Sequence, residues 1–204
     1  MEITFVRHGQ SMGNMTNDYS TPAHDRLSPN GWQQAERLVA RLEGYAFDEI
    51  YVSSLRRAWE TVTPYLRARG RSAEMWPELA EACWQNDRNV PELVRQGNPR
   101  PFAVDQALAG SFVARAGVSY CPPENETYHE GLARISQART LLLDRHLGRD
   151  DAILVVGHEF AGSRLLELLL DVEPVGRFYH HNTGLTRLVE RVDGGFIARF
   201  VNRL

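Results

Sequence analysis

Short apolar runs alternate along most of the chain with segments whose apolar residues recur at helical spacing. In the first half, Ser28 is suited to cap a helix whose first turn holds Pro29, and Gly44 and Gly70 are suited to end helices. The elements expected there are strands at 3–6 and 50–52 and helices at 29–44 and 56–69. This alternation of strand and helix periods is typical of an α/β domain.

The second half continues the same alternation. The run 152–156 is apolar at every position, which predicts a central strand covered on both faces. The other elements expected there are helices at 127–147 and 161–170 and a closing hairpin of strands 185–192 and 196–201. We therefore predict a three-layer α/β sandwich with a mainly parallel central sheet and helices on both faces.

Between these halves, residues 82–126 are rich in Pro, Gly, Asn and Arg and keep no sustained period. So long a connection needs an explanation. We expect a small cap inserted over the carboxyl edge of the sheet, with short helices at 91–96 and 104–116. The whole chain, 1–204, is then expected to be one domain that carries an insertion.

The amino-acid composition excludes several kinds of catalysis and argues against several kinds of binding partner. All 23 basic residues among the 204 are arginine, so Schiff-base formation on a side chain, a P-loop lysine and a Ser-Lys dyad are excluded. The formal net charge of -3 and the absence of a basic stripe argue against nucleic-acid binding. No apolar run is long enough for a membrane span, no signal peptide precedes the first strand, and two cysteines suggest no disulfide scaffold, so a cytoplasmic protein is expected.

Candidate chemistry follows three of the expected strands. Arg7-His8-Gly9 follows the first, Ser53-Ser54-Leu55-Arg56-Arg57 the second, and Gly157-His158-Glu159 the central one. Ligands of open α/β sheets bind at these carboxyl ends. A neutral imidazole can attack phosphorus, arginines can neutralise the phosphoryl oxygens, and a carboxylic acid, best supplied by Glu81, can protonate the leaving alcohol.

The motifs around these residues resemble the histidine phosphatase superfamily, which includes the cofactor-dependent phosphoglycerate mutases. The resemblance rests on six segments in the family's order, spread over about nine-tenths of the chain. They are Arg7-His8-Gly9 with Ser11 and Asn14, Asp25-Arg26-Leu27-Ser28-Pro29-Asn30-Gly31, Gln34-Ala35, Ser53-Ser54-Leu55-Arg56-Arg57-Ala58 with Thr61, Gly157-His158, and Asn182-Thr183.

This resemblance implies a role for each matching residue. His8 corresponds to the histidine that becomes phosphorylated, Glu81 to the proton donor, and His158 to the second histidine of the phosphate pocket. The residues implied in phosphate binding are Arg7, Gly9, Asn14, Arg57, His158 and Thr183. No metal or organic cofactor belongs to such a site, because the arginines and a helix N-terminus supply the positive charge.

Two departures from the family pattern affect the expected site. Glu159 follows the second histidine where the family often has a small residue, so its carboxylate must point away from the pocket or the pocket is altered. The segment after Glu81 lacks an expected glycine, which leaves Glu78 and Asp87 as rival proton donors. A metal site at His180-His181 with His129 is disfavoured, since adjacent residues of an extended segment point to opposite faces.

Together these features predict a metal-independent phosphomonoester hydrolase that acts through a phosphohistidine on a small phosphorylated metabolite. A cofactor-dependent phosphoglycerate mutase is the first alternative; the short chain and the small cap favour hydrolysis. A phosphate-binding regulatory module without turnover is the second alternative. The natural substrate and the cap arginines that contact it stay open, as does a homodimer.

Overall fold

The computed structural model describes residues 1–83, 110–115, 118 and 126–204. Its centre is a seven-stranded sheet in the order β4-β3-β2-β5-β1-β6-β7. Neighbouring strands from β4 to β1 are parallel, whereas β6 and β7 are antiparallel to their neighbours. The strands are β1 (Glu2–Arg7), β2 (Glu49–Ser53), β3 (Ala73–Trp76), β4 (Phe112–Ala114), β5 (Ala152–Gly157), β6 (Leu185–Glu190) and β7 (Phe196–Arg203).

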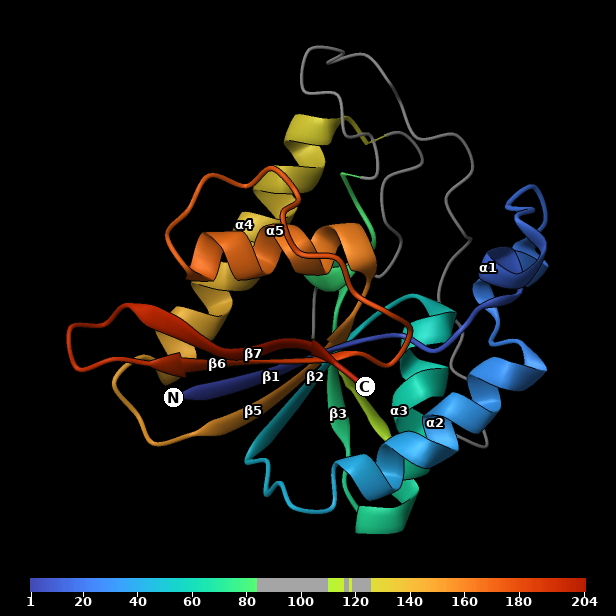
Figure 1. The fold of residues 1–204 in the computed structure, drawn as a ribbon, viewed down its shortest axis with the longest axis horizontal. Helices are drawn as coiled ribbons and strands as arrows, with labels where there is room; N and C mark the ends of the chain where they lie inside the picture. Colours follow the sequence, from blue (N-terminus) through green and yellow to red (C-terminus); the bar gives the residue numbers. More distant parts are fainter. Residues whose placement is uncertain (84–109, 116–117, 119–125) are drawn as a thin grey trace.

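Helices lie on both faces of this sheet, which gives three layers (Figure 1). On one face α2 packs beside α3, and on the other α4 packs beside α5. The helices are α1 (Met12–Thr16), α2 (Pro29–Arg41), α3 (Arg56–Arg69), α4 (Tyr128–His146) and α5 (Glu159–Leu169), with 3-10 turns η1 (Pro22–Asp25) and η2 (Pro77–Leu79). None of these helices combines the length and apolar character that crossing a bilayer requires, within the part of the chain that the structure describes.

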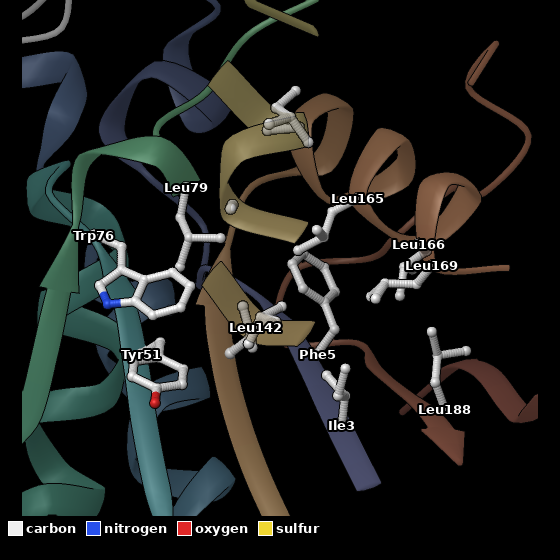
Figure 2. Packing of buried hydrophobic residues seen from close by; sticks show 14 of the residues in the cluster. Ile3, Phe5, Tyr51, Trp76, Leu79, Leu142, Leu165, Leu166, Leu169 and Leu188 are labelled. Carbon is white, nitrogen blue, oxygen red and sulfur yellow. The ribbon is translucent and has the colours of Figure 1, made fainter. Parts of the chain in front are cut away.

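The central strand β5 is buried on both faces, as its unbroken apolar run predicts. Ile153 and Val155 pack into the core under α4 and α5, whereas Leu154 and Val156 pack into the core under α2 and α3. On the first of these faces Phe5 projects from β1 toward Leu165 of α5, and Figure 2 shows this packing. The sheet thereby holds the carboxyl ends of β1 and β5 rigidly side by side.

Local signals set several of the element ends. Ser28 accepts a hydrogen bond from the Gly31 amide at the start of α2, and Thr127 begins α4 in a capping box with Glu130. Gly70 ends α3 in the left-handed region at φ +59°, which glycine adopts without steric cost. Gly44, in contrast, does not end α2, because that helix stops at Arg41 with Leu42 as its C-cap.

The prediction of an α/β sandwich is confirmed, and the segment proposed as a cap needs correction. Residues 112–114 form strand β4, which pairs in parallel with β3, where a helix over 104–116 was expected. Part of the insertion therefore extends the main sheet. The other expected helix of the cap, 91–96, lies outside the described residues.

The close contact between α5 and β1 predicts that a larger side chain at Gly162 lowers the stability of the protein. A Cβ atom added at Gly162 would lie 2.1 Å from Cζ of the Phe5 ring, so the ring or the helix must shift. We expect Gly162→Ala to lower the free energy of unfolding by about 1–3 kcal/mol, the usual range for overpacking a core. Urea unfolding measures this, with Gly44→Ala as the matched control because no atom lies within 4 Å of its added Cβ. Equal losses in the two variants would contradict the packing argument.

Candidate active site

The parallel strands bring the candidate residues to one edge of the sheet. Arg7 ends β1 and His8 follows it, Ser53 ends β2, and His158 follows β5. The His8 amide donates to the carbonyl oxygen of Gly157 at 2.9 Å, which fixes the two histidine-bearing segments against each other. The His8 and His158 ring centroids are 5.1 Å apart. The three predicted strand ends therefore do form one cluster.

The contacts of the His8 ring define its protonation. Nδ1 lies 2.7 Å from the carbonyl oxygen of Gly9, which only accepts, so Nδ1 carries the proton. Nε2 lies 3.2 Å from Nε of Arg57, which only donates, so Nε2 presents its lone pair. Burial, with the positive charges of Arg57 and Arg7, lowers the pKa of His8 well below its usual value of 6.5. The imidazole is thus held neutral with one nucleophilic nitrogen.

Both candidate phosphate-binding arginines are buried and already paired with carboxylates. Arg57 Nη1 is paired with Oδ1 of Asp25, the last residue of the 3-10 turn η1. Arg7 Nη1 donates to the carbonyl oxygen of His180 and lies 2.9 Å from Oε2 of Glu159. Hydrogen-bonded and ion-paired guanidinium groups are restrained in orientation, which suits binding of a tetrahedral anion.

His158 is completely buried, and its Nε2 lies 2.7 Å from Oγ of Ser53. This contact joins the end of β2 to the start of α5, because His158 is the N-cap residue of that helix. The second histidine therefore lies beside His8 with its ring orientation set by a side chain of the central sheet.

Glu81 reaches the site from the segment after η2. Its Oε1 accepts hydrogen bonds from the amides of Ala161 at 2.9 Å and Ala82 at 3.2 Å. The Ala161 amide belongs to the first turn of α5, where free N–H groups were expected to face an anion. Glu81 accepts from one of these donors, so the N-terminus of α5 positions the candidate acid.

Glu159 does not point away from the site. Its carboxylate makes the ion pair with Arg7 described above, and about a fifth of its side chain is exposed. Burial, together with the nearby negative charge of Glu81, raises the pKa of Glu159, and the positive charges of Arg7 and His181 oppose that rise. Of the two possibilities left open by the sequence, the structure therefore favours an altered pocket.

The remaining predicted residues lie behind or around His8. The Gly9 amide donates to Oγ1 of Thr61 at 2.8 Å, and the Thr183 amide donates to the carbonyl oxygen of Arg7 at 3.0 Å. A direct contact of either amide with phosphate would require breaking these bonds. A Cβ at Gly9 would lie 2.9 Å from the carbonyl oxygen of Gly31. Only glycine therefore lets this segment pack so closely against α2.

An amide bridge connects the site to α1. Nδ2 of Asn182 lies 3.0 Å from the His8 carbonyl oxygen and 3.3 Å from Oδ1 of Asn14. Asn14 also caps α1 together with Ser11. Asn14 thus lies beside the segment that carries His8, and the link through Asn182 shows how the loop before β6 supports the His8 backbone.

Three residues of the motif segments make contacts in the site that were not predicted from the sequence. These are Asp25, which pairs with Arg57, Ser53, which contacts His158, and Asn182. Each stands in a motif segment, which was the available signal. Their partners are distant in sequence, so only the assembled sheet identifies them.

The structure also places Glu78, one of the two rival candidates for the proton donor, and the His180-His181 pair. Glu78 binds Arg115, with Oε1 2.6 Å from Nη2, and Asp87 lies outside the described residues. His180 is buried with Nε2 3.1 Å from Oγ1 of Thr186, whereas His181 is exposed. Within the described ranges, no three His, Cys, Asp or Glu side chains are grouped so that they could hold a metal ion.

Comparison with known proteins agrees with this geometry. The family pattern of the histidine phosphatase superfamily, branch 1, matches residues 3–203. The chain belongs to this superfamily. The match spans all the strands and helices that build the site.

Three proteins similar to this chain share between 21% and 26% of their aligned residues with it. A 2,3-bisphosphoglycerate-dependent phosphoglycerate mutase of Cytophaga hutchinsonii is 26% identical over 174 residues, which cover 85% of this chain and 78% of the mutase. The alpha-ribazole phosphatase of Shigella flexneri has a similar structure, with a TM-score of 0.69, 21% identity and coverage of 99% of this chain and 96% of the other. Phosphoserine phosphatase of Entamoeba histolytica, solved with 3-phosphoglyceric acid, gives a TM-score of 0.67 at 23% identity, covering 100% and 97%.

Proposed function

We propose that this histidine phosphatase superfamily member hydrolyses the phosphomonoester of a small phosphorylated metabolite through a covalent phosphohistidine. The observation that carries the proposal is the state of His8. A neutral ring whose Nδ1 donates to Gly9 and whose Nε2 faces Arg57 has a lone pair available for phosphorus beside a guanidinium group. That combination of nucleophile and positive charge suits phosphoryl transfer.

In the first step, Nε2 of His8 attacks phosphorus, the bond from phosphorus to the ester oxygen breaks, and the leaving oxygen takes a proton from Glu81. Arg57 shifts from Nε2 to the phosphoryl oxygens as the new bond forms, and Arg7 and His158 stabilise the same oxygens. In the second step, Glu81 removes a proton from water, water oxygen attacks phosphorus, and the bond to Nε2 breaks. Inorganic phosphate and free His8 result.

The named relatives support small metabolites as the substrate class. The phosphatases among them are named for alpha-ribazole and phosphoserine, and one of their structures holds 3-phosphoglyceric acid. The mutase from Cytophaga hutchinsonii supports the second candidate function, a 2,3-bisphosphoglycerate-dependent phosphoglycerate mutase. Both functions use the same phosphohistidine chemistry. They differ in whether water or a second phosphoglycerate hydroxyl receives the phosphoryl group.

Metal-independent hydrolysis is the direct test of this function. With p-nitrophenyl phosphate and a chelator present, we expect steady release of inorganic phosphate. Because the pKa of His8 is lowered, kcat/KM should not fall as the pH decreases through about 6.5, where an ordinary histidine becomes protonated. Activity that requires an added divalent metal would contradict the mechanism.

A second assay separates the two candidate functions. Incubation with 3-phosphoglycerate and a trace of 2,3-bisphosphoglycerate should yield inorganic phosphate if the chain is a hydrolase. Accumulation of 2-phosphoglycerate with little free phosphate would identify a mutase. A panel of phosphorylated metabolites then ranks substrates by kcat/KM.

A further inference from the structure

The ion pair between Arg7 and Glu159 places a carboxylate where a phosphoryl group needs positive charge. We propose that Glu159 competes with the substrate's phosphoryl group for Arg7, so that anion binding requires this carboxylate to be protonated or withdrawn. Its Oε2 lies 2.9 Å from Nη1 of Arg7. Arg7 is nine-tenths buried, and its Nε has no hydrogen-bond partner among the described residues. The guanidinium group therefore has a donor left for a ligand that approaches when Glu159 leaves.

The charged groups around Arg7 and Arg57 determine how strongly this competition affects anion binding. The two buried arginines each face one carboxylate, Arg7 facing Glu159 and Arg57 facing Asp25. Glu81 adds a further carboxylate close to Glu159. A dianion that enters with all of these groups ionised meets no net positive charge. Removing the charge of Glu159 takes these two arginines and three carboxylates from a net charge of -1 to 0 and leaves Arg7 without its paired carboxylate. The site is buried, so this change acts where Coulomb interactions are strong.

Asp25 and Glu159 differ in how easily they can yield. Asp25 is a buried residue at the end of the turn η1, and its other oxygen, Oδ2, accepts a hydrogen bond from the Arg56 amide at 2.7 Å. Glu159 is partly exposed on the first turn of α5. Asp25 is thus fixed as an orienting partner of Arg57, whereas Glu159 is free to rotate toward solvent when an anion arrives.

The direction of the pH dependence follows from the groups that face Glu159. They are Arg7 at the end of β1, Glu81 after η2, and His181 before β6. Burial and Glu81 outweigh Arg7 and His181, so Glu159 takes up a proton at a higher pH than an ordinary glutamate. As the pH falls through that raised pKa, Glu159 becomes neutral and releases Arg7. Anion affinity should therefore increase toward acid pH.

This inference rests on the proposed function, and the experiment separates the two. Sulfate is the probe, because it remains a dianion between about pH 5 and pH 8, and its binding is measured by calorimetry on the full chain. We expect Glu159→Gln to bind sulfate about tenfold more tightly than the unsubstituted protein at about pH 8, and the ratio to shrink toward about pH 5. Glu159→Ala is measured alongside, because alanine also removes any amide contact with Arg7.

Glu36→Gln is the matched control, since it removes the same charge from an exposed position of α2. It should bind sulfate like the unsubstituted protein at every pH. Equal sulfate affinity of both Glu159 variants and the unsubstituted protein, with p-nitrophenyl phosphate turnover retained, would overturn the competition and leave the proposed function standing. Failure of every protein to bind sulfate and to release phosphate would overturn both.

Discussion

Replacing His8 with alanine should abolish turnover, with kcat for p-nitrophenyl phosphate falling by at least about 10⁴-fold. The reason is that Nε2 of His8 is the proposed covalent acceptor and faces Nε of Arg57. The ring of His158 is 5.1 Å from that of His8 and has its Nε2 against Ser53, so it is not placed to replace the nucleophile. Steady-state kinetics measures the loss.

Covalent labelling makes the same prediction independently of turnover. A brief reaction with a ³²P-labelled substrate, stopped with alkali, should leave acid-labile label on the unsubstituted chain and none on His8→Ala. His129→Ala is the matched control, because His129 is an exposed histidine of α4. Label that persists in His8→Ala, or turnover that survives the substitution, would mean that the phosphoryl group passes through another residue or directly to water.

Hydrophobic periodicity was sufficient to predict most strands of the sheet and the four long helices that the structure describes, α2, α3, α4 and α5. The run 152–156 could be placed at the centre because both of its faces are apolar, and α3 could be bounded because Gly70 ends it. Strands β3 and β4 could not be found this way. Each is only three or four residues long, and β4 lies within a polar segment. Their pairing depends on contacts with each other and with β2, which no local pattern contains.

Some residues of the candidate site could likewise be predicted from the sequence, and others could not. Arg7, His8 and His158 could be chosen because they follow strands and match motif positions, and the sheet brings them together. The carboxylates were harder to place. Asp25 pairs with Arg57 across 32 residues of sequence, and Glu81 meets the Ala161 amide across 80. Such contacts are set by how the helices pack on the sheet, so charge and spacing along the chain could not reveal them.

Glu159 shows most clearly what the sequence alone could not predict, namely the direction of a side chain. The sequence flags a carboxylate beside the second histidine but leaves its direction open. The direction is decided by the geometry of α5, whose first residue is Glu159 and whose N-cap is His158. The Phe5 ring leaves no room for a side chain at Gly162, so α5 lies close to β1, and from the start of this helix the Glu159 side chain reaches Arg7.

Replacing Glu81 with glutamine should lower turnover of an alkyl phosphate by about 10²- to 10⁴-fold, the usual contribution of general acid–base catalysis. Glutamine keeps an Oε1 that can accept from the Ala161 amide, so the local structure should be retained. The loss should be smaller for formation of the phosphoenzyme from p-nitrophenyl phosphate, whose leaving group needs no proton. Hydrolysis of the phosphoenzyme still needs a base, so acid-labile label should accumulate on Glu81→Gln.

This pattern distinguishes an acid from a merely structural carboxylate. A residue that only held α5 in place would lower turnover of aryl and alkyl phosphates by the same factor and would not trap the intermediate. Glu78→Gln is the matched control, because Glu78 is the nearby rival and binds Arg115 through its carboxylate. If Glu78→Gln shows the leaving-group dependence and Glu81→Gln does not, the proton donor is Glu78. If Glu81→Gln instead keeps full activity on both substrates, the contact with the Ala161 amide serves only to cap the helix.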